Sequence, residues 1–465
     1  MTTGKKVVII GGGVSGLATA YFLQRSGADV TVLERQDAPG GTMQTISDGP
    51  WLVEIGPNSA LETTPLFGLM FEGLGITDER IYADPSSDRR YILRDGVLHP
   101  LPLSPVAFMT STLWTGRGKL RLLKEPFIGR GGKEETIAEF VERRLGGEFL
   151  DYAINPFVAG VYAGNPEELS VRAAFPKLYA LEERYGGLIR GMIGGARERK
   201  RRAEKAKDRA KMFSFRRGMQ TFPRAVARYL GGNLLLGHEV SALERAPEGR
   251  FRIAYRRGSH ASEMTADVVV ISVPASAADK FVRAFSPPLA DAFRSVFYPP
   301  VAEVFLGYPE KAMSRPLDGF GYLIPAKEKR MILGTIWSSS LFPGRAPAGH
   351  VALTTFVGGS RQPGMVALDD GELLRVVTSE LRSIMGVTGE PVYQKIIRWQ
   401  HAIPQYNLGY LSFLERIDDL EREVPGLLFC SNFRGGIAVG DCVMNGEKTA
   451  RRVMADGGKY AEFSH

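Results

Sequence analysis

The stretch that decides the fold runs Lys6-Val7-Val8-Ile9-Ile10-Gly11-Gly12-Gly13-Val14-Ser15-Gly16 and continues to Glu34. The β-branched residues before the glycines are typical of a buried parallel strand. The pattern then predicts a helix that ends near Ser26 and a second strand over Asp29–Leu33. Strand, glycine-rich loop, helix and strand in this order predict a nucleotide-binding βαβ unit.

Each glycine of the loop has a reason to be a glycine. Gly11 permits the tight turn, Gly13 lets a pyrophosphate approach the backbone, and Gly16 lets helix and strand pack closely. The N–H groups at the helix start are free to bind phosphate oxygens. Glu34 closes the second strand, where its carboxylate is placed to accept both hydroxyls of a ribose.

The same N-terminus also has features of a signal peptide. Lys5 and Lys6 precede an uncharged run, and Ala18-Thr19-Ala20 is similar to a cleavage site. However, the four glycines within this run are poor residues for a hydrophobic helix, so we favour the nucleotide-binding interpretation. No other stretch has the roughly 18 apolar residues that a membrane span needs.

A second glycine-rich segment near the C-terminus indicates FAD rather than NAD. The short apolar segment Gly426–Cys430 predicts a strand, the segment 432–442 carries Gly435, Gly436 and Gly440, and a helix is expected to begin near Val443. Together with Gly40-Gly41, which follow Glu34 in place of a further regular βα unit, this segment suits a long cofactor held at both ends. A helix N-terminus aimed at the flavin would stabilise its negatively charged reduced form.

Composition limits the classes of partner. The 465 residues are 44% hydrophobic, and 59 basic against 51 acidic residues give a net charge of +8, which permits an anionic partner without proving one. The two cysteines and six histidines never fall at metal-ligand spacing, so we expect no metal site. The segment 197–211 holds nine basic and three acidic residues but no aromatic residue, which argues against nucleic-acid binding.

Five motifs are spread along the chain: Glu34-Arg35 with Gly40-Gly41, Gly56-Pro57-Asn58-Ser59, the segment Asn155–Gly164, the segment Thr355–Gly359, and Pro404-Gln405-Tyr406. These motifs resemble those of the FAD-dependent protoporphyrinogen oxidases, within the wider amine-oxidase-like flavoproteins. They cover the chain in the family's order, and the last three are specific to the porphyrinogen branch.

This resemblance implies non-covalent FAD and oxygen-dependent oxidation of protoporphyrinogen IX to protoporphyrin IX in haem biosynthesis. It further implies peripheral binding to the cytoplasmic face of the cell membrane and hand-over of product to a ferrochelatase, by a monomer or a homodimer. Two alternatives stay open: a coproporphyrinogen III oxidase of the same flavin family, and an amine oxidase or carotenoid desaturase on the same fold.

The resemblance also assigns residues to the cofactor. The residues implied to line FAD are Gly11, Gly12, Gly13, Val14, Ser15, Gly16, Glu34, Arg35, Gly41, Thr42, Gly56, Pro57, Asn58 and Ser59, with Val240 at the adenine end and Trp399, Ile437, Ala438 and Val439 on the flavin side. Many relatives carry an arginine or an aromatic residue around Thr42. We therefore expect Thr42 to contact FAD, but the resemblance does not indicate which kind of interaction it makes.

The substrate residues follow in the same way. Leu323 and Ile336 are implied to clamp one pyrrole ring and Phe356 to stack on another, with Gly160 and Asn58 close to the macrocycle. Arg90 is implied to bind a propionate, which suits a guanidinium, and the adjacent Arg89 is the alternative in register. No side chain is assigned as catalytic, because the chemistry takes place on FAD.

The patterns along the chain, together with the resemblance, predict an α/β fold in three parts, and the membrane-facing role of the third part is what the resemblance implies. A Rossmann-like FAD-binding domain comprises residues 1–86, 212–278 and 399–465, a sheet-based substrate domain comprises 87–98 and 279–398, and an inserted helical, membrane-facing domain comprises 99–211. Apolar periodicity predicts helices over 137–149 and 178–193. Strands are predicted over 234–243, 251–256, 264–274, 301–308, 321–324, 332–337 and 351–357.

Overall fold

The computed structural model describes residues 4–194 and 210–455. Its first sheet is parallel and has the strand order β10-β2-β1-β14-β20. These strands are β10 (Leu234–Leu236), β2 (Asp29–Glu34), β1 (Lys6–Ile10), β14 (Val268–Ile271) and β20 (Leu427–Phe429). Three distant parts of the chain therefore build one sheet, as the sequence predicts for a nucleotide-binding fold.

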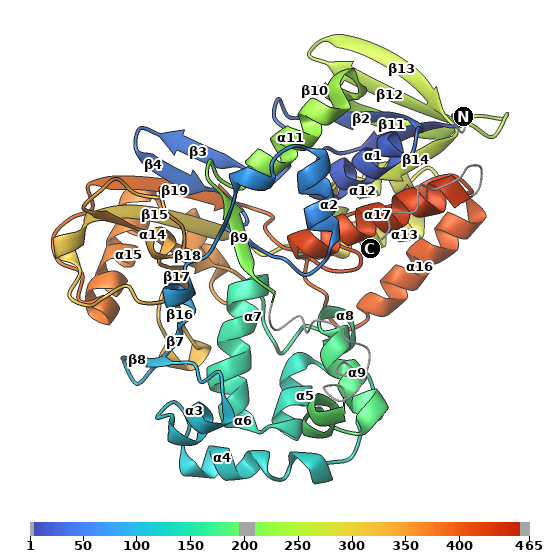
Figure 1. Cartoon of the computed structure of the whole chain (residues 1–465). Coiled ribbons are helices and arrows are strands. Elements are labelled where there is room, and N and C mark those ends of the chain that lie inside the picture. The colour runs from blue at the N-terminus through green and yellow to red at the C-terminus, as the bar shows by residue number, and fades with distance from the viewer. Residues whose placement is uncertain (1–3, 195–209, 456–465) are drawn as a thin grey trace.

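Helices cover this sheet. Figure 1 shows α1 (Val14–Arg25) and α17 (Val439–Ala455) side by side, and a Cβ on Gly446 of α17 would lie 2.7 Å from the Ala18 Cβ of α1. The remaining helices of this part are α2 (Leu66–Gly73), α11 (Thr221–Leu230), α12 (Ala275–Val282), α13 (Pro287–Ser295) and α16 (Tyr410–Glu423). The close contact at Gly446 sets α17 directly against the first turns of α1.

The second large sheet has seven strands in the order β19-β15-β18-β17-β16-β7-β8. They are β19 (Tyr393–Trp399), β15 (Val301–Pro309), β18 (His350–Gly358), β17 (Gly334–Ile336), β16 (Gly321–Leu323), β7 (Arg90–Arg94) and β8 (Val97–Pro100). Helix α15 (Asp370–Met385) packs Leu373, Val377 and Leu381 against one face. The other face is turned toward the rest of the molecule, where the short helix α14 (Ser338–Leu341) follows β17.

Three small sheets accompany the two large ones in the part of the chain that the structure describes. The hairpin of β3 (Thr45–Asp48) and β4 (Trp51–Glu54) lies on the seven-stranded sheet, where the Trp51 ring fills the space that a side chain at Gly307 would need. Strands β5 (Ala60–Leu61), β9 (Met212–Phe215) and β6 (Arg80–Tyr82) form a second small sheet, and β11 (Glu239–Arg245), β12 (Phe251–Arg257) and β13 (His260–Ala266) form a third.

Between β8 and β9 the described chain is mostly helical, and it forms the lower part of the molecule in Figure 1. Its helices are α3 (Pro105–Thr110), α4 (Gly116–Leu122), η3 (Glu125–Phe127), α5 (Ile137–Arg144), α6 (Gly147–Phe149), η4 (Leu150–Ile154), α7 (Asn155–Tyr162), α8 (Val171–Ala174) and α9 (Pro176–Tyr185), followed by a helix over residues 188–194. Among the residues described, no helix is both long and apolar enough to span a bilayer.

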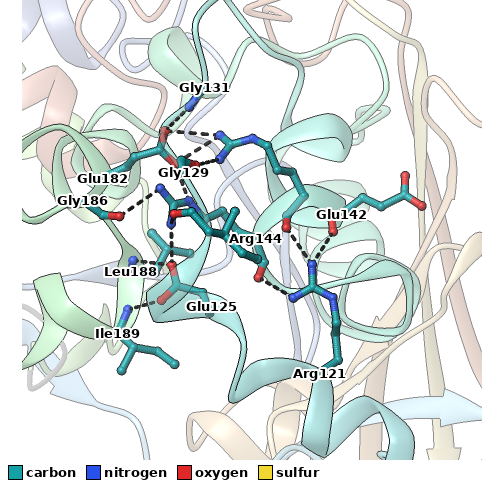
Figure 2. Close-up of polar contacts among 12 residues, drawn as sticks. Arg121, Glu125, Gly129, Gly131, Glu142, Arg144, Glu182, Gly186, Leu188 and Ile189 are labelled. Carbon is teal, nitrogen blue, oxygen red and sulfur yellow. Dashed lines mark hydrogen bonds and ion pairs between the residues drawn. The ribbon is translucent and has the colours of Figure 1, made fainter.

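A buried ion-pair cluster holds these helices together, as Figure 2 shows. Arg144 is fully buried; its Nε donates to Glu182 Oε2 at 2.5 Å and its Nη1 to Glu125 Oε1 at 3.2 Å. Glu125 also accepts hydrogen bonds from the backbone N–H groups of Leu188 and Ile189. Removing one member of such a cluster would leave an unpaired buried charge, so it fixes the helix over 188–194 against η3.

The structure corrects several predicted boundaries. The strand expected over 234–243 is two strands in different sheets, because Gly237 turns the chain at φ +71°. Glycines likewise end the two long predicted helices, at Gly146 and Gly186, both with positive φ. The segment expected as one strand over 264–274 divides at Asp267. The last helix begins at Val439 rather than Val443, and most of the basic segment 197–211 lies outside the described residues.

Candidate active site

The first glycine-rich loop has the close contacts that its spacing predicts. Gly11 adopts φ +111°, and a Cβ there would lie 2.7 Å from the Ser272 carbonyl oxygen. A Cβ on Gly16 would overlap the Gly11 carbonyl oxygen. By contrast, no atom lies within 4 Å of a Cβ built on Gly13. The loop is therefore packed tightly at its two ends and open at Gly13.

This opening fits a dinucleotide phosphate. Gly13 is the N-cap of α1, no side chain caps the helix, and no acidic residue occupies the first turn, so the helix start is available to an anion. Val14 and Gly13 are partly exposed, whereas Ser15 and Gly16 are buried. The residues present thus fit the pyrophosphate of FAD, which the open backbone at Gly13 would allow to approach closely.

Glu34 lies next to this opening. Its Oε2 accepts a hydrogen bond from the Gly12 N–H at 2.6 Å and its Oε1 accepts one from the Gln36 N–H at 2.8 Å, so the carboxylate is held in place beside the loop. Arg35 is exposed and lines an open pocket with Gly237 and Glu239. Val240 is buried in the adjacent strand β11, where its carbonyl accepts a hydrogen bond from Lys280. Glu34 and Arg35, which are predicted to line FAD, therefore lie in one region of the structure with Val240, which is predicted to lie at the adenine end of FAD.

The second cofactor segment joins the first through Thr42 and Gly56. A Cβ on Gly56 would overlap the Thr42 carbonyl oxygen, and Gly41 lies against the Cα of Gly13. The predicted cofactor residues Gly56, Pro57, Asn58 and Ser59 are all partly exposed, as are Ile437 and Val439 at the start of α17, while Ala438 is exposed. A Cβ on Gly440 would lie 2.5 Å from Thr63 Oγ1, so the start of α17 lies beside the segment that follows Ser59, although more than 370 positions separate them in sequence.

Strand register places the predicted substrate residues on one face of the seven-stranded sheet. Leu323 pairs with Gly334, which pairs with Phe356, so these three residues point to the same side. Ile336 is two residues after Gly334 and shares that side. Leu323, Ile336 and Phe356 are each only partly buried. A Cβ on Gly334 would lie 3.2 Å from Leu323 Cδ2, so the Leu323 side chain packs closely beside this glycine.

Arg90 lies on this same face of the sheet, whereas Arg89 is engaged in an ion pair elsewhere. Arg90 pairs with Gly321 on β16, it is exposed, and its guanidinium lies 5.6 Å from the Phe320 ring centroid. Arg89 instead donates to Asp318 at 2.6 Å. Within the described part of the chain, no carboxylate pairs with Arg90. The structure therefore favours Arg90 over Arg89 as the free cation at the site.

The apolar face formed by Leu323, Ile336 and Phe356 is called the slot below, and the mostly helical chain between β8 and β9 the helical layer. Helix α7 of the helical layer lies beside the slot. A Cβ built on Gly160 would stand 2.6 Å from Leu323 Cδ2. The end of the same helix contacts the other two porphyrinogen-type motifs: the Ala163 carbonyl accepts from the Ser360 N–H, and Gln405 Nε2 donates to the Tyr162 carbonyl at 2.8 Å. Motifs that are far apart in sequence thus meet around one helix.

Two buried carboxylates lie beside the site and were not predicted from the sequence. Glu54 lines a small cavity together with Asn58 and Ile336, and burial raises its pKa to about 7 against the opposing effect of Arg345. Glu303 stands directly opposite Phe356, and burial raises its pKa to about 8. A lone glutamate in the apolar strand Val301–Tyr308 is the signal that would have identified Glu303.

Trp399 connects these carboxylates with the cofactor segment. Its indole Nε1 donates to the Ile55 carbonyl at 2.8 Å, directly before Gly56. Trp399 pairs with Val301 on β15 and therefore shares the sheet face of Glu303. As for metals, residues 4–194 and 210–455 contain no group of three or more His, Cys, Asp or Glu side chains arranged to hold an ion.

Comparison with known proteins agrees with this geometry. The model of the family of flavin containing amine oxidoreductases matches residues 14–454. The chain is 32% identical to protoporphyrinogen oxidase 2, chloroplastic/mitochondrial, of Arabidopsis thaliana, over 97% of this chain and 94% of the relative. It is 27% identical to coproporphyrinogen III oxidase of Bacillus subtilis, over 96% and 97% of the two chains.

Solved structures show the same fold. A crystal structure from Exiguobacterium sp. 255-15 superposes with a TM-score of 0.81 at 22% identity, covering 98% of this chain and all of that one. Wild-type putrescine oxidase bound to putrescine superposes with a TM-score of 0.69 at 17% identity, covering 98% and 99%. The chain belongs to the flavin-containing amine oxidoreductase family, in the branch of the FAD-dependent protoporphyrinogen oxidases.

Proposed function

We propose that the protein oxidises protoporphyrinogen IX to protoporphyrin IX in porphyrin biosynthesis, with three O₂ reduced to three H₂O₂. The observation that carries this proposal is the sheet face on which a free arginine, Arg90, and three apolar slot residues stand together beside the cofactor segments. The plant relatives that are 32% and 33% identical over nearly the whole chain carry the name of this activity.

The slot would hold the macrocycle by its apolar faces. When bound, FAD supplies the two-electron oxidation chemistry and its reoxidation by O₂. Leu323 and Ile336 would contact one pyrrole ring and Phe356 another, all from the same face of the sheet. Apolar walls also exclude water from the reacting carbon, which strengthens the electrostatic interactions within the site.

Arg90 would fix the orientation of the substrate. A propionate is a planar carboxylate that a guanidinium binds through two parallel N–H···O bonds. Because Arg90 stands at the exposed edge of the slot, a propionate bound there leaves the macrocycle free to enter toward Phe356. The polar end of the substrate would then face solvent while the ring is buried.

Coproporphyrinogen III oxidation is the second candidate, supported by the Bacillus subtilis relative. Coproporphyrinogen carries two more propionates than protoporphyrinogen, and each would require a polar or cationic partner. Arg90 stands next to the apolar residues of the slot face and pairs with no carboxylate among the described residues. Together with the apolar lining of Leu323, Ile336 and Phe356, this arrangement favours the substrate with two propionates.

Initial rates of porphyrin fluorescence distinguish the two substrates. Purified holoenzyme in detergent under air should convert protoporphyrinogen IX faster than coproporphyrinogen III. A faster rate with coproporphyrinogen III would assign the protein to the second candidate. Failure with both porphyrinogens by a yellow, FAD-loaded protein would contradict the proposal and direct the search to amines and polyenes.

We also propose that the helical layer contacts an anionic membrane surface, on the cytoplasmic face of the cell membrane. Large apolar side chains are exposed on α3, α4, η3, the loop residues beside them and the helix over 188–194; they are Leu103, Val106, Met109, Leu120, Leu123, Phe127, Met192 and Ile193. Residues 101–133 carry six basic side chains, and the single acidic one, Glu125, is buried against Arg144. Apolar anchors within a basic surface suit anionic headgroups.

The exposed apolar side chains of the helical layer lie in the third part of the chain that the sequence predicts. We propose that residues 99–211 form the membrane-facing unit, with the boundaries 1–86, 212–278 and 399–465 for the FAD unit and 87–98 and 279–398 for the substrate unit. A poorly soluble porphyrin product would leave near the membrane, where a ferrochelatase could receive it. The proposal does not depend on whether the protein is a monomer or a homodimer.

A further inference from the structure

Glu303 is an unusual residue for its position. It lies in β15, where every other residue from Val301 to Tyr308 is apolar, and its side chain is only 4% exposed. Its Oε2 is buried and has no hydrogen-bond partner. An unpartnered buried carboxylate oxygen costs free energy, so its presence calls for a functional reason.

The surroundings of Glu303 belong to the active site. Phe356, a residue of the proposed slot, stands directly opposite it on β18. On β19 the residue opposite Glu303 is Ile397, and Trp399, two residues along on the same face, donates its indole N–H to the Ile55 carbonyl at 2.8 Å. The orphan carboxyl therefore lies between the substrate slot and the segment that leads into Gly56.

Glu54 is the second carboxyl of this region. Glu54 is as buried as Glu303 and interacts with it electrostatically. Unlike Glu303, Glu54 accepts hydrogen bonds at both carboxyl oxygens. Thr45 Oγ1 donates to its Oε2 at 2.6 Å, and the Met219 N–H and Arg345 Nη2 donate to its Oε1 at 3.0 and 3.4 Å. Glu54 also reaches the small cavity that Asn58 and Ile336 line. Glu54 thus has hydrogen-bond donors that favour its charged form, whereas Glu303 Oε2 has none.

We propose that Glu303 and Glu54 form a proton-holding pair, which carries one proton at rest on Glu303 and takes up a second on Glu54 as the substrate is oxidised. Each two-electron oxidation removes two electrons and two protons from the substrate. One proton accompanies the electron pair, and the pair of carboxyls holds the other until O₂ is reduced to H₂O₂, which consumes both. The carboxyls then return to their resting state, so atoms and charge balance over the cycle.

The charged groups around the pair are consistent with this assignment. Arg345 is 2% exposed and faces Glu54, and Lys395 on β19 shares the sheet face of Glu303. Because burial raises the pKa of Glu54 to about 7 and that of Glu303 to about 8, the pair binds close to one proton between these values. Two carboxyls that interact titrate as a unit, so the two steps belong to the pair.

The visible spectrum of bound flavin tests the inference without any porphyrinogen, so its result is independent of the proposed substrate. We expect the flavin absorbance of the wild-type holoenzyme to change in two steps as pH rises from 5.5 to 9.5. Glu303→Gln and Glu54→Gln should each remove one step, and Glu54→Gln should move the remaining midpoint to lower pH because it removes a neighbouring negative charge. Glu380→Gln is the matched control: Glu380 is 8% exposed on the opposite side of the same sheet, and the wild-type titration should persist.

A titration that is unchanged in both Glu303→Gln and Glu54→Gln would overturn the inference, and so would a wild-type spectrum that does not depend on pH. If one variant does not retain FAD, the other decides alone, since each removes one protonation step. Arg345→Gln keeps both carboxyls and should move the midpoints to higher pH, because the cation that favours the charged form of Glu54 is lost. An unmoved midpoint in that variant would count equally against the pair.

Discussion

Gly160 of α7 lies against Leu323 of β16 so closely that a Cβ on the glycine would stand 2.6 Å from Leu323 Cδ2. This contact joins the helical layer to the seven-stranded sheet at the place where the substrate slot is proposed. It explains why a glycine is needed on an exposed helix position, where helix propensity alone would favour alanine. The contact therefore offers a direct test of the slot.

Gly160→Ala should lower kcat/KM for the porphyrinogen by about tenfold, since the added methyl displaces Leu323 from the slot. FAD content should not change, because neither residue touches the cofactor segments. In the double variant Gly160→Ala with Leu323→Ala, space for the new methyl is restored, so the two effects should be less than additive. Steady-state kinetics of the wild type, the two single variants and the double variant measures this coupling. Strictly additive effects would show that Gly160 does not act through Leu323.

Arg90→Ala should raise KM by about 10- to 100-fold, which corresponds to the roughly 1.5–3 kcal/mol of a charge-assisted hydrogen bond. Bound FAD should stay the same. Arg89→Ala is the matched control because Arg89 is occupied by Asp318 at the protein surface. An Arg90→Ala enzyme with the KM of the wild type would remove Arg90 from the propionate role.

Gly13→Ala should weaken FAD binding at least tenfold, or about 1.4 kcal/mol, while the apoprotein keeps its thermal stability. The reason is that a Cβ on Gly13 meets no protein atom within 4 Å and fills only the space proposed for the pyrophosphate. Fluorescence titration of the apoprotein with FAD measures the affinity. Gly16→Ala makes a useful contrast: its Cβ would overlap the Gly11 carbonyl oxygen, so stability itself should fall.

Stability should depend on pH through Glu303. Its pKa is raised by burial from 4.5 to about 8, so the folded state binds more protons than the unfolded state between these values. Stability from this group is therefore complete below about pH 4.5 and is lost as pH rises through 8. Glu303→Gln should gain stability relative to wild type at pH 9 compared with pH 5, by on the order of a few kcal/mol. Thermal unfolding of both apoproteins at the two pH values measures it; an equal difference at both would contradict a neutral Glu303.

Leu123→Ser with Phe127→Ser should weaken binding to anionic phospholipid vesicles by about 100-fold or more, since burial of each side chain contributes roughly 1.5–3 kcal/mol. Both side chains are largely exposed on the helical layer, at 68% and 84%. Val392→Ser, which removes an apolar side chain exposed to 58% near the seven-stranded sheet, is the control. Vesicle sedimentation that does not distinguish the two proteins would exclude this surface as the membrane contact.

Local patterns were sufficient to predict the first βαβ unit and most strands. Val7 to Ile10 and Gly11 to Gly16 act through neighbours in sequence, so their spacing contains the information. The same local reasoning extended helices across Gly146 and Gly186, because apolar periodicity continues past a glycine that turns the chain. The start of α17 at Val439 was missed because the residues before it carry no capping signal that marks a helix N-terminus.

The active site depends on contacts that local patterns do not contain. Arg90 reaches the slot because β7 pairs in parallel with β16, a pairing between residues more than 200 positions apart. Glu54 and Glu303 come from different sheets and become a pair only when the β3–β4 hairpin packs on β15. Resemblance to a family proposed Arg90, Leu323 and Phe356, while the two carboxyls became visible only through their burial.

Anaerobic rapid mixing tests the central claim most directly, namely that this chain uses its flavin to oxidise a porphyrinogen. FAD-loaded protein is mixed with protoporphyrinogen IX in the absence of oxygen, and flavin absorbance is followed in time. The account predicts bleaching of the flavin at a rate no slower than kcat, with the colour restored on admission of air. Flavin that remains oxidised while the same protein produces porphyrin under air would contradict it.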